Sequence, residues 1–188
     1  ARKDLNDRSM AAATALSPLG DYAFVAVEGS NRVEILDAYD RQTLASLPGI
    51  GRAPDGVALD EARGRLLVTG YLSRDLLALD VASVLASTSF DVPPAVAVRT
   101  IAREPLSPTV LRGKQIFHDA GDPRMSHGGY ISCASCHHDG DQDGRVWDFT
   151  DRGEGLRNTV SLLGRRGMAQ ARLHWSGNFD EVQDFEGD

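Results

Sequence analysis

TALSPLGDYAFVAVEGSNRVEILDA (residues 14–38) is followed 43 positions later by VALDEARGRLLVTGYLSRDLLALDV (residues 57–81), and this pair of stretches decides the fold of the first half of the chain. Similar residues recur at that offset without a gap, namely Ala15-Leu16 with Ala58-Leu59, Phe24-Val25 with Leu67-Val68, Ser30 with Ser73, and Leu36-Asp37 with Leu79-Asp80. Each copy contains short apolar segments that are separated by turn residues. We therefore predict that each copy folds as a set of short antiparallel strands.

The strands are expected at corresponding places in the two copies. In the first copy, residues 22–27 form an apolar strand, 28–31 carry turn residues and 33–36 form the next strand. In the second copy, the same events recur at residues 66–70 and 76–80. A repeat of about 40 to 45 residues with several short strands is typical of one blade of a β-propeller.

The two copies resemble the blades of YVTN or surface-layer propellers, in which P-x-G-V-A-L-D leads into a strand and the blade later reads L-x-x-L-D. Residues 54–60 read PDGVALD here. Two blades cannot close a ring, because propellers use about 4 to 8 of them. Earlier blades would precede residue 1, or another chain would cover the open sheets; we favour the first, which makes this chain a piece of a longer protein. A simple meander of hairpins packed on the second half is the alternative.

The charge and composition of the chain exclude some classes of function. The chain has 188 residues, a formal net charge of −7 and a pI near 5.2. This charge argues against a nucleic-acid partner, which requires basic patches to neutralise phosphates. No stretch approaches the roughly 18 apolar residues of a membrane-spanning helix, and residues 1–10 lack the apolar core of a signal peptide.

The second half differs in character from the first. We expect two β-propeller-type repeats over residues 1–85, a linker over 86–107 that is rich in small residues and prolines, and a mainly α-helical domain over 108–188. The fold class is therefore mixed, with antiparallel β blades followed by helices. Ser107 followed by Pro108 is a helix start signal. It predicts a helix over residues 109–118, and further helical segments are expected at 156–163 and 168–173.

The chemistry is concentrated at Cys133-Ala134-Ser135-Cys136-His137, which uses both cysteines of the chain. C-x-x-C-H is the pattern of covalent c-type haem attachment. Two thiols one helical turn apart can add to the two vinyl groups of the porphyrin, and the histidine that follows can then supply the proximal iron ligand. We predict one haem c, with Cys133 and Cys136 as attachment points and His137 as axial ligand. The mainly α-helical domain over 108–188 is therefore expected to be a cytochrome c domain.

Other sites built on a cysteine pair fit less well. A structural zinc site needs four ligands, and the chain has no second cysteine pair. A thioredoxin-type dithiol expects a βαβ setting and has no need of the adjacent histidine.

Four ordered motifs extend the argument. They are Gly113-Lys114-Gln115-Ile116-Phe117, the C-x-x-C-H pattern, Arg157-Asn158-Thr159-Val160 and His174-Trp175-Ser176-Gly177-Asn178. In this order they resemble the bacterial di-haem cytochrome c peroxidases and the related MauG-type enzymes, over residues 108–186. The resemblance implies a peroxidase-like redox function, a second haem in the complete protein, an electron-transfer role for Trp175 and a catalytic role for Gln183.

The resemblance is incomplete on the distal side of the iron. The family's distal histidine is expected between the haem motif and Arg157, but residues 139–156 contain no histidine. The iron could therefore have an open face for peroxide, or another side chain could close it. The candidates are Met125, Met168 and His127, and also His118, His138 and His174. His138 directly follows the proximal ligand and is badly placed to reach the opposite face, and His174 fits better as a structural partner of Trp175.

Asp139, Asp141 and Asp143 follow the haem motif with the spacing that opens a calcium loop. The twelfth loop position is Thr150 instead of glutamate, so solvated turn acids are the simpler interpretation. Calcium remains open, because the resembling family binds it between its two haem domains.

The sequence therefore predicts a haem-dependent redox protein of the peroxidase type, an oxidoreductase. Its partners would be hydrogen peroxide or another small oxidant, together with an electron-donor protein or second haem domain. The alternative is an electron-transfer cytochrome c with a six-coordinate haem, in which the propeller serves as a docking surface. Covalent haem attachment implies a periplasmic or otherwise extracytoplasmic location in a bacterium.

Overall fold

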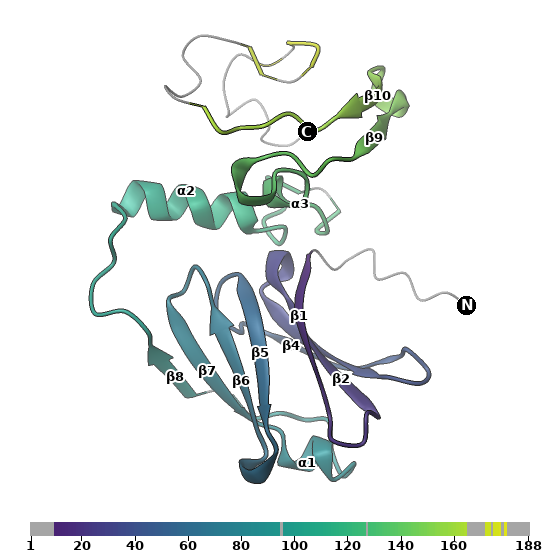
Figure 1. The fold of residues 1–188 in the computed structure, drawn as a ribbon, viewed down its shortest axis with the longest axis vertical. Helices are drawn as coiled ribbons and strands as arrows, with labels where there is room; N and C mark the ends of the chain where they lie inside the picture. The colour runs from purple at the N-terminus through teal and green to yellow at the C-terminus, as the bar shows by residue number, and fades with distance from the viewer. Residues whose placement is uncertain are drawn as a thin grey trace.

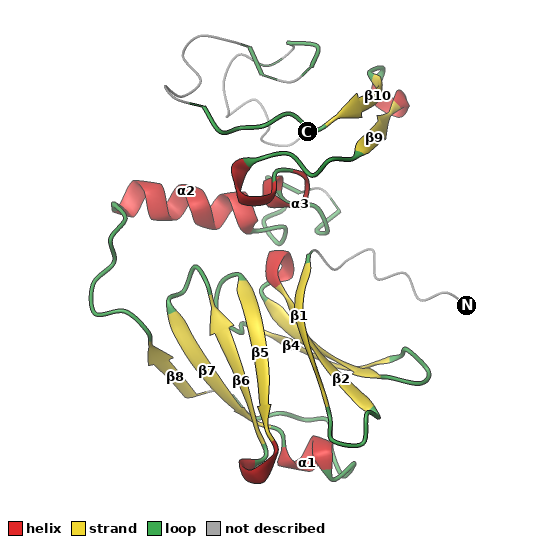
Figure 2. Cartoon of the chain, viewed as in Figure 1, coloured by secondary structure: helices red, strands yellow, loops and turns green. Residues whose placement is uncertain are grey.

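Two four-stranded antiparallel sheets dominate the first half of the chain, and short helices with one hairpin make up the second (Figure 1). The computed structural model describes residues 10–94, 96–126, 128–164, 172–173, 175–177 and 179. Figure 2 shows that the strands gather in the first half and that the longest helix follows them. Neither sheet closes into a barrel.

The first sheet is a simple meander in the order β1-β2-β3-β4. Its strands are β1 (Ala11–Leu16), β2 (Tyr22–Val27), β3 (Arg32–Asp37) and β4 (Thr43–Pro48). The strands predicted over residues 22–27 and 33–36 are confirmed. Phe24 lies opposite Ala15 on one side and Ile35 on the other, so these three side chains share one face of the sheet.

The second sheet repeats this meander in the order β5-β6-β7-β8. Its strands are β5 (Pro54–Asp60), β6 (Arg65–Gly70), β7 (Asp75–Asp80) and β8 (Val96–Arg99). The bounds of β6 and β7 are those of β2 and β3 shifted by 43 positions, so the sequence repeat is also a structural repeat. Residues 86–107, predicted to be a linker, supply β8, which pairs with β7 after the short helix α1 (Ala82–Leu85).

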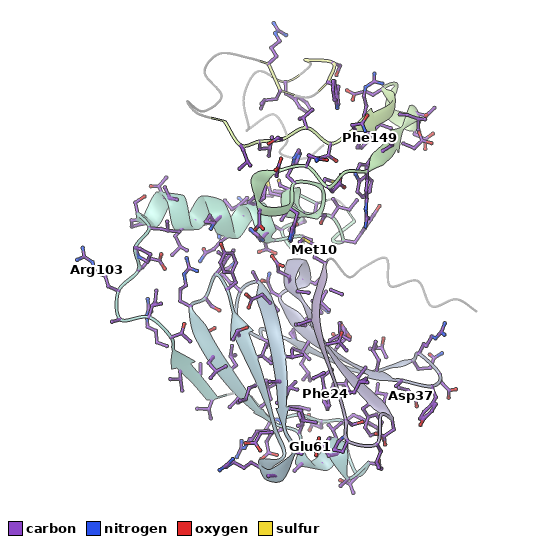
Figure 3. The ribbon with its side chains drawn as sticks, viewed as in Figure 1. Met10, Phe24, Asp37, Glu61, Arg103 and Phe149 are labelled. Carbon is purple, nitrogen blue, oxygen red and sulfur yellow. The ribbon has the colours of Figure 1, made fainter. Side chains whose placement is uncertain are left out.

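The hydrophobic core lies between the two sheets. The first sheet contributes Phe24, Val33 and Ile35, which are fully buried, and Phe24 is labelled in Figure 3. The second sheet contributes Leu66, Val68, Leu77 and Leu79, and Val81 and Val84 close the end next to α1. Burial of these apolar side chains is the main force that holds the sheets together.

The sheets leave a cavity of about 530 Å³ on the side of β4 and β8. Its lining consists of Leu47, Pro48, Gly49, Ile50, Gly51, Asp75, Leu77, Leu79, Val92, Pro93, Pro94 and Ala97. At the other side β1 lies next to β5 (Figure 1). The sheets are therefore in close contact through their first strands, with a wedge of space near their last strands.

The second half begins with α2 (Pro108–His118), which confirms the helix predicted over 109–118. The Ser107 hydroxyl accepts the Val110 N–H at 3.3 Å and so caps the helix. After it come α3 (Cys133–Cys136), β9 (Val146–Phe149) and β10 (Gly155–Asn158). Single turns of 3-10 helix also occur, at η1 (Glu28–Ser30), η2 (Glu61–Arg63), η3 (His138–Gly140) and η4 (Thr150–Arg152).

The prediction of a mainly α-helical second half is not evident in the described residues, and the helix expected over 156–163 is wrong. Residues 155–158 form a strand that pairs with β9. Gly153 and Gly155 take positive φ values of 80° and 66°, which turn the chain back into this hairpin. Most of the helix expected over 168–173 lies outside the described residues.

Within the described part of the chain, none of the helices is both long enough and apolar enough to cross a membrane.

Candidate functional site

The C-x-x-C-H motif forms one tight helical turn. Cys133 and Cys136 are the first and last residues of α3, and His137 caps its C-terminus with its N–H bonded to the Cys133 carbonyl at 2.9 Å. At the other end, the Ser132 N–H donates to the Ser135 hydroxyl at 3.0 Å. These bonds hold the two thiols one helical turn apart and the imidazole on the next residue, which is the arrangement that the attachment chemistry requires.

Both thiols are free and partly buried. Burial raises the pKa of the Cys133 thiol. Burial, with added repulsion from the Asp143 carboxylate, raises the pKa of Cys136 to about 11. At neutral pH both side chains are therefore neutral thiols, the state in which a structural cysteine is unreactive until a partner such as a vinyl group is brought to it.

The His137 side chain has a buried ring nitrogen, Nδ1, that finds no hydrogen-bond partner among the described residues. A buried polar atom without a partner is costly, on the order of 1–3 kcal/mol. An imidazole that binds a metal normally donates the N–H of its second nitrogen to a partner that fixes the ring orientation. Among the described residues, Nδ1 of His137 has no such partner.

The loop after the motif is held to the segment that contains Arg157-Asn158-Thr159-Val160. The Gly140 N–H donates to the His137 carbonyl at 2.9 Å, and the Gly140 carbonyl accepts the Leu162 N–H at 2.8 Å. The residues that follow the haem motif and those that follow Arg157-Asn158-Thr159-Val160 are therefore joined by a backbone bond that does not depend on side-chain identity.

Asp143 fixes the same loop. Its carboxylate accepts the Trp147 indole N–H at 2.8 Å and the Arg145 backbone N–H at 3.0 Å. Burial alone would raise the pKa of Asp143, but these hydrogen bonds lower it below the ordinary value. In the described part of the chain, no three His, Cys, Asp or Glu side chains gather as a metal site, so Asp139, Asp141 and Asp143 form no calcium loop there.

Trp175 lies against the end of β10. Its indole N–H donates to the Asn158 carbonyl, although the side chain is 55% exposed. The neighbouring Ser176 hydroxyl donates to the Glu154 carboxylate. The structure thus brings Trp175, from the last of the four motifs, beside Asn158 of the third motif. Trp175 is held at the surface of the protein and not in a core.

The remaining predicted residues are distributed differently. Met125 is half-buried in a turn in which its N–H bonds to the Asp122 carbonyl at 3.0 Å. His127, Met168 and Gln183 lie outside the described residues, as does His174. The side chain of His138 is largely exposed. Of the three candidates Met125, Met168 and His127, Met125 alone lies among the described residues.

His118, a further distal candidate, is turned toward the sheets. Its Nδ1 lies 2.6 Å from the Glu28 carboxylate, and both residues are only 8% exposed. Its ring packs edge-on against Tyr71 at 5.8 Å between centroids. Tyr71 in turn contacts Lys114, whose ammonium donates to the phenol oxygen at 2.5 Å. These contacts, which no local sequence pattern announces, dock α2 onto the loops that join the strands.

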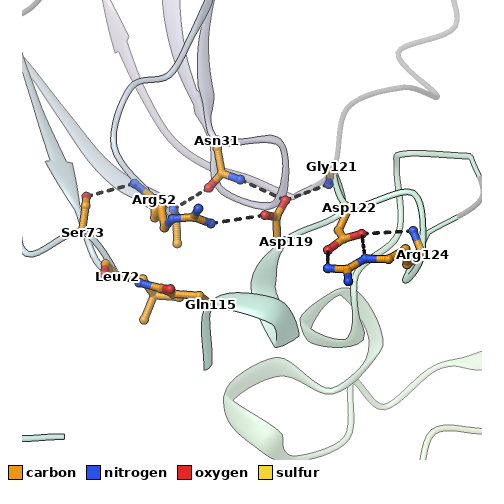
Figure 4. Close-up of polar contacts among 10 residues, drawn as sticks. Asn31, Arg52, Leu72, Ser73, Gln115, Asp119, Gly121, Asp122 and Arg124 are labelled. Carbon is orange, nitrogen blue, oxygen red and sulfur yellow. Dashed lines mark hydrogen bonds and ion pairs between the residues drawn. The ribbon is translucent and has the colours of Figure 1, made fainter. Parts of the chain in front are cut away.

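A second set of polar contacts continues this docking surface (Figure 4). Asp119 accepts from the Asn31 amide at 3.0 Å and from the Arg52 guanidinium at 3.4 Å. The Asn31 side-chain oxygen also accepts the Ala53 N–H at 2.9 Å, so one residue joins both sheets to the second half. The backbone bond from Ala120 to Gly29, at 2.8 Å, completes the contact.

The residues around the motif fit a bound haem. The two thiols lie at the first and last residues of α3, and His137 follows as its C-cap. Apolar side chains next to the motif are exposed, with Tyr130 at 45%, Ile131 at 37% and Leu162 at 42%. Exposed apolar surface of this kind is typical of a ligand site, and a porphyrin is a large apolar ring that would cover it.

Of the comparisons with known proteins, a family match bears on this assignment. No curated protein matches the chain. Among solved structures, hydrazine synthase from Kuenenia stuttgartiensis shows 18% sequence identity and a TM-score of 0.36, over 43% of this chain and 22% of that one. The chain therefore spans under a quarter of the length of that structure. The family described as di-haem cytochrome c peroxidase matches residues 108–186, and this match indicates haem-dependent, peroxidase-like redox chemistry for the second half of the chain.

Proposed function

We propose that the chain is a haem c redox protein of the peroxidase type, in which the haem is attached through Cys133 and Cys136 and its iron is bound by His137. The observation that carries this proposal is the one-turn helix α3, which places a thiol at each end and the imidazole on the residue that follows. Haem, when bound, supplies the electron-transfer and peroxide chemistry. Attachment forms one carbon–sulfur bond per thiol, with the thiol proton passing to the other vinyl carbon.

The polypeptide contributes orientation. The backbone bond from His137 to Cys133 sets the position of the imidazole relative to the thiols. His137 would bind iron through Nε2, while Nδ1 carries its proton. Trp175 would pass electrons at the edge of this cluster, Gln183 would assist catalysis on the distal side, and Met125, Met168 and His127 are the candidates for a sixth ligand.

The proposal extends to the rest of the molecule. Residues 1–85 would be two propeller blades at the end of a longer propeller, with β8 as the outer strand of the second blade. The rest of 86–107 would be a connecting segment, and 108–188 the first haem domain of a di-haem module. The coincidence of the strand bounds at an offset of 43 positions supports the blades. An electron-donor protein or second haem domain would reduce the iron, and covalent attachment places the protein outside the cytoplasm.

Covalent attachment can be tested directly on denaturing gels stained for haem. We expect the chain to retain haem, and Cys133→Ala together with Cys136→Ala to abolish retention. His137→Ala should lose the axial ligand and change the absorption spectrum, whereas His138→Ala, at the exposed neighbouring histidine, should not. Equal staining of the double cysteine variant and the parent chain would contradict the proposal.

The peroxidase function and the electron-carrier alternative predict different spectra. A haem with an open face should be high-spin and should react with hydrogen peroxide. A six-coordinate carrier should be low-spin and inert to peroxide, and a methionine ligand would add its charge-transfer band, lost in Met125→Leu or Met168→Leu. A low-spin haem that peroxide leaves unchanged would reject the peroxidase assignment for this site.

A further inference from the structure

The first sheet reaches the helical turn of the C-x-x-C-H motif through the side chain of Met10. Met10 directly precedes β1 and lies at the end of this strand that faces α3 (Figures 1 and 3). The Ser132 hydroxyl donates to the Met10 sulfur at 3.7 Å. Ser132 is 5% exposed and directly precedes Cys133, the first proposed attachment point. The Met10 side chain therefore lies beside the Cys133 end of α3, although Met10 and Ser132 are 122 positions apart in the sequence.

The backbone of Met10 is held in an unusual conformation. Its φ is 58°, in the left-handed region that residues with a side chain rarely adopt. The register between β1 and β2 shifts directly after it, between Ala11 and Ala13. The Met10 carbonyl accepts the Glu28 N–H at 2.8 Å, and this bond ties Met10 to η1. A strained residue persists only where the surrounding structure maintains it, and such residues cluster at functional sites.

The same turn of the first sheet also holds the end of α2. The Glu28 side chain meets His118 at 2.6 Å, and the Gly29 carbonyl accepts the Ala120 N–H at 2.8 Å. η1 thus fixes Met10 on one side and the chain that leads from α2 toward the haem motif on the other. The position of α3 therefore depends on the first sheet as well as on the bonds within the turn.

We propose that Met10 is a positioning residue of the haem site, which covers the Cys133 end of α3 and keeps water away from it, so that the first sheet helps to set the reduction potential of the haem. This inference rests on the proposed attachment of haem. A thioether is apolar and adapts its shape, which suits it to fill the space against an irregular turn. The apolar surroundings of a metal site limit the access of water and thereby tune the reduction potential.

The direction of the effect follows from charge. Oxidised haem carries one more positive charge than reduced haem, and water stabilises a charge better than apolar side chains do. Loss of the Met10 side chain should therefore favour the oxidised state and lower the reduction potential. The same loss should open the Cys133 thiol to solvent, whose burial in the intact protein raises its pKa.

The first test is a redox titration of the haem-loaded chain. Met10→Ala should lower the ratio of reduced to oxidised haem at a fixed poise on the order of tenfold, which is about 59 mV for one electron. Met10→Leu, which keeps an apolar side chain of similar volume, should retain the potential of the parent chain. Leu19→Ala is the matched control, because Leu19 is 82% exposed in the turn between β1 and β2 of the same sheet. It should leave the potential unchanged.

The second test uses the chain without haem and follows alkylation of each cysteine separately by mass spectrometry of its peptide. Met10→Ala should accelerate alkylation of Cys133 severalfold, because the thiol loses its cover. Cys136 is the internal control, since it lies at the other end of α3. Its rate should stay that of the parent chain.

The outcomes separate this inference from the proposed function. A chain that retains no haem on denaturing gels would reject both. A chain that retains haem, with the parent potential in Met10→Ala, would reject the inference alone. A potential in Met10→Leu as low as that in Met10→Ala would also reject it, because apolar cover would then not be the cause. Equal acceleration at both cysteines would indicate general loosening of the second half and would overturn a local role for Met10.

Discussion

The buried pair between Glu28 and His118 should control how firmly the second half of the chain is docked on the sheets. Glu28 lies in η1 between β2 and β3, and His118 is the last residue of α2. Their side chains meet at 2.6 Å and each residue is 8% exposed. Glu28→Leu removes the carboxylate and leaves the His118 imidazole buried without its hydrogen-bond partner. His118→Leu removes the imidazole and leaves the Glu28 carboxylate buried without its partner.

The magnitude follows from this burial. Removal of one partner of a buried, hydrogen-bonded pair costs about 3 kcal/mol, because the group left behind stays desolvated. With a urea dependence of about 2 kcal/mol per molar, the loss shifts the unfolding midpoint down by roughly 1.5 M. The double variant Glu28→Leu with His118→Leu should recover most of this loss, since a pair of apolar side chains of similar volume leaves no unpaired group.

Two measurements report on the change. Both tryptophans, Trp147 and Trp175, lie in the second half, so their fluorescence follows its unfolding in urea. Trypsin cleavage after the exposed Arg103, in the segment that joins the halves (Figure 3), should accelerate in the single variants as docking loosens. Asp60→Asn, at the exposed ion pair with Arg63, is the control and should change neither. Single variants with the parent midpoint, or a double variant as unstable as the singles, would refute the reasoning.

Three further results are expected. Phe24→Ala, at a fully buried core position, should lower the free energy of unfolding by about 3–5 kcal/mol, and a loss under 1 kcal/mol in urea titration would mean that the sheets do not pack as described. The Arg124 guanidinium lowers the pKa of Asp122 to about 2. The contribution of this ion pair to the free energy of unfolding is therefore complete above the ordinary pKa of 3.8 and is lost as pH falls toward 2. Carbon-detected NMR of the Asp122 carboxyl checks this, and a titration midpoint near 4 would contradict it. In the chain without haem, alkylation of Cys136 should increase with pH up to about 11, and a plateau reached by pH 9 would show that the thiol is not shielded as the structure indicates.

Most strands of the two sheets could be predicted because the sequence patterns that indicate them lie within a few neighbouring residues. Alternation of apolar and turn residues within a few positions defines β2, β3, β6 and β7, and the offset of 43 positions makes each copy evidence for the other. The Ser107-Pro108 start of α2 is equally local, since the cap and the first turn involve neighbouring residues. The haem motif depends only on the spacing of Cys133, Cys136 and His137.

Other elements could not be predicted in this way. β8 has only four residues and is a strand because β7 offers it an edge, so composition alone indicated a linker. Residues 156–163 carry apolar spacing compatible with a helix, yet pairing with β9 and the positive φ of Gly155 select a hairpin. In both cases pairing with another strand outweighs the local preference.

By itself, the sequence determined the strand repeat, the first helix and the C-x-x-C-H turn, because each is encoded by spacing along a short stretch of chain. Tertiary structure alone decided that His118 belongs to the sheets through Glu28, that His137 keeps an unpaired buried nitrogen, and that the motifs around Gly140, Asn158 and Trp175 meet. The physical reason is that burial and hydrogen bonding depend on which groups the folded chain brings within about 3 Å of each other. Such proximity between distant residues has no periodic signature in the sequence.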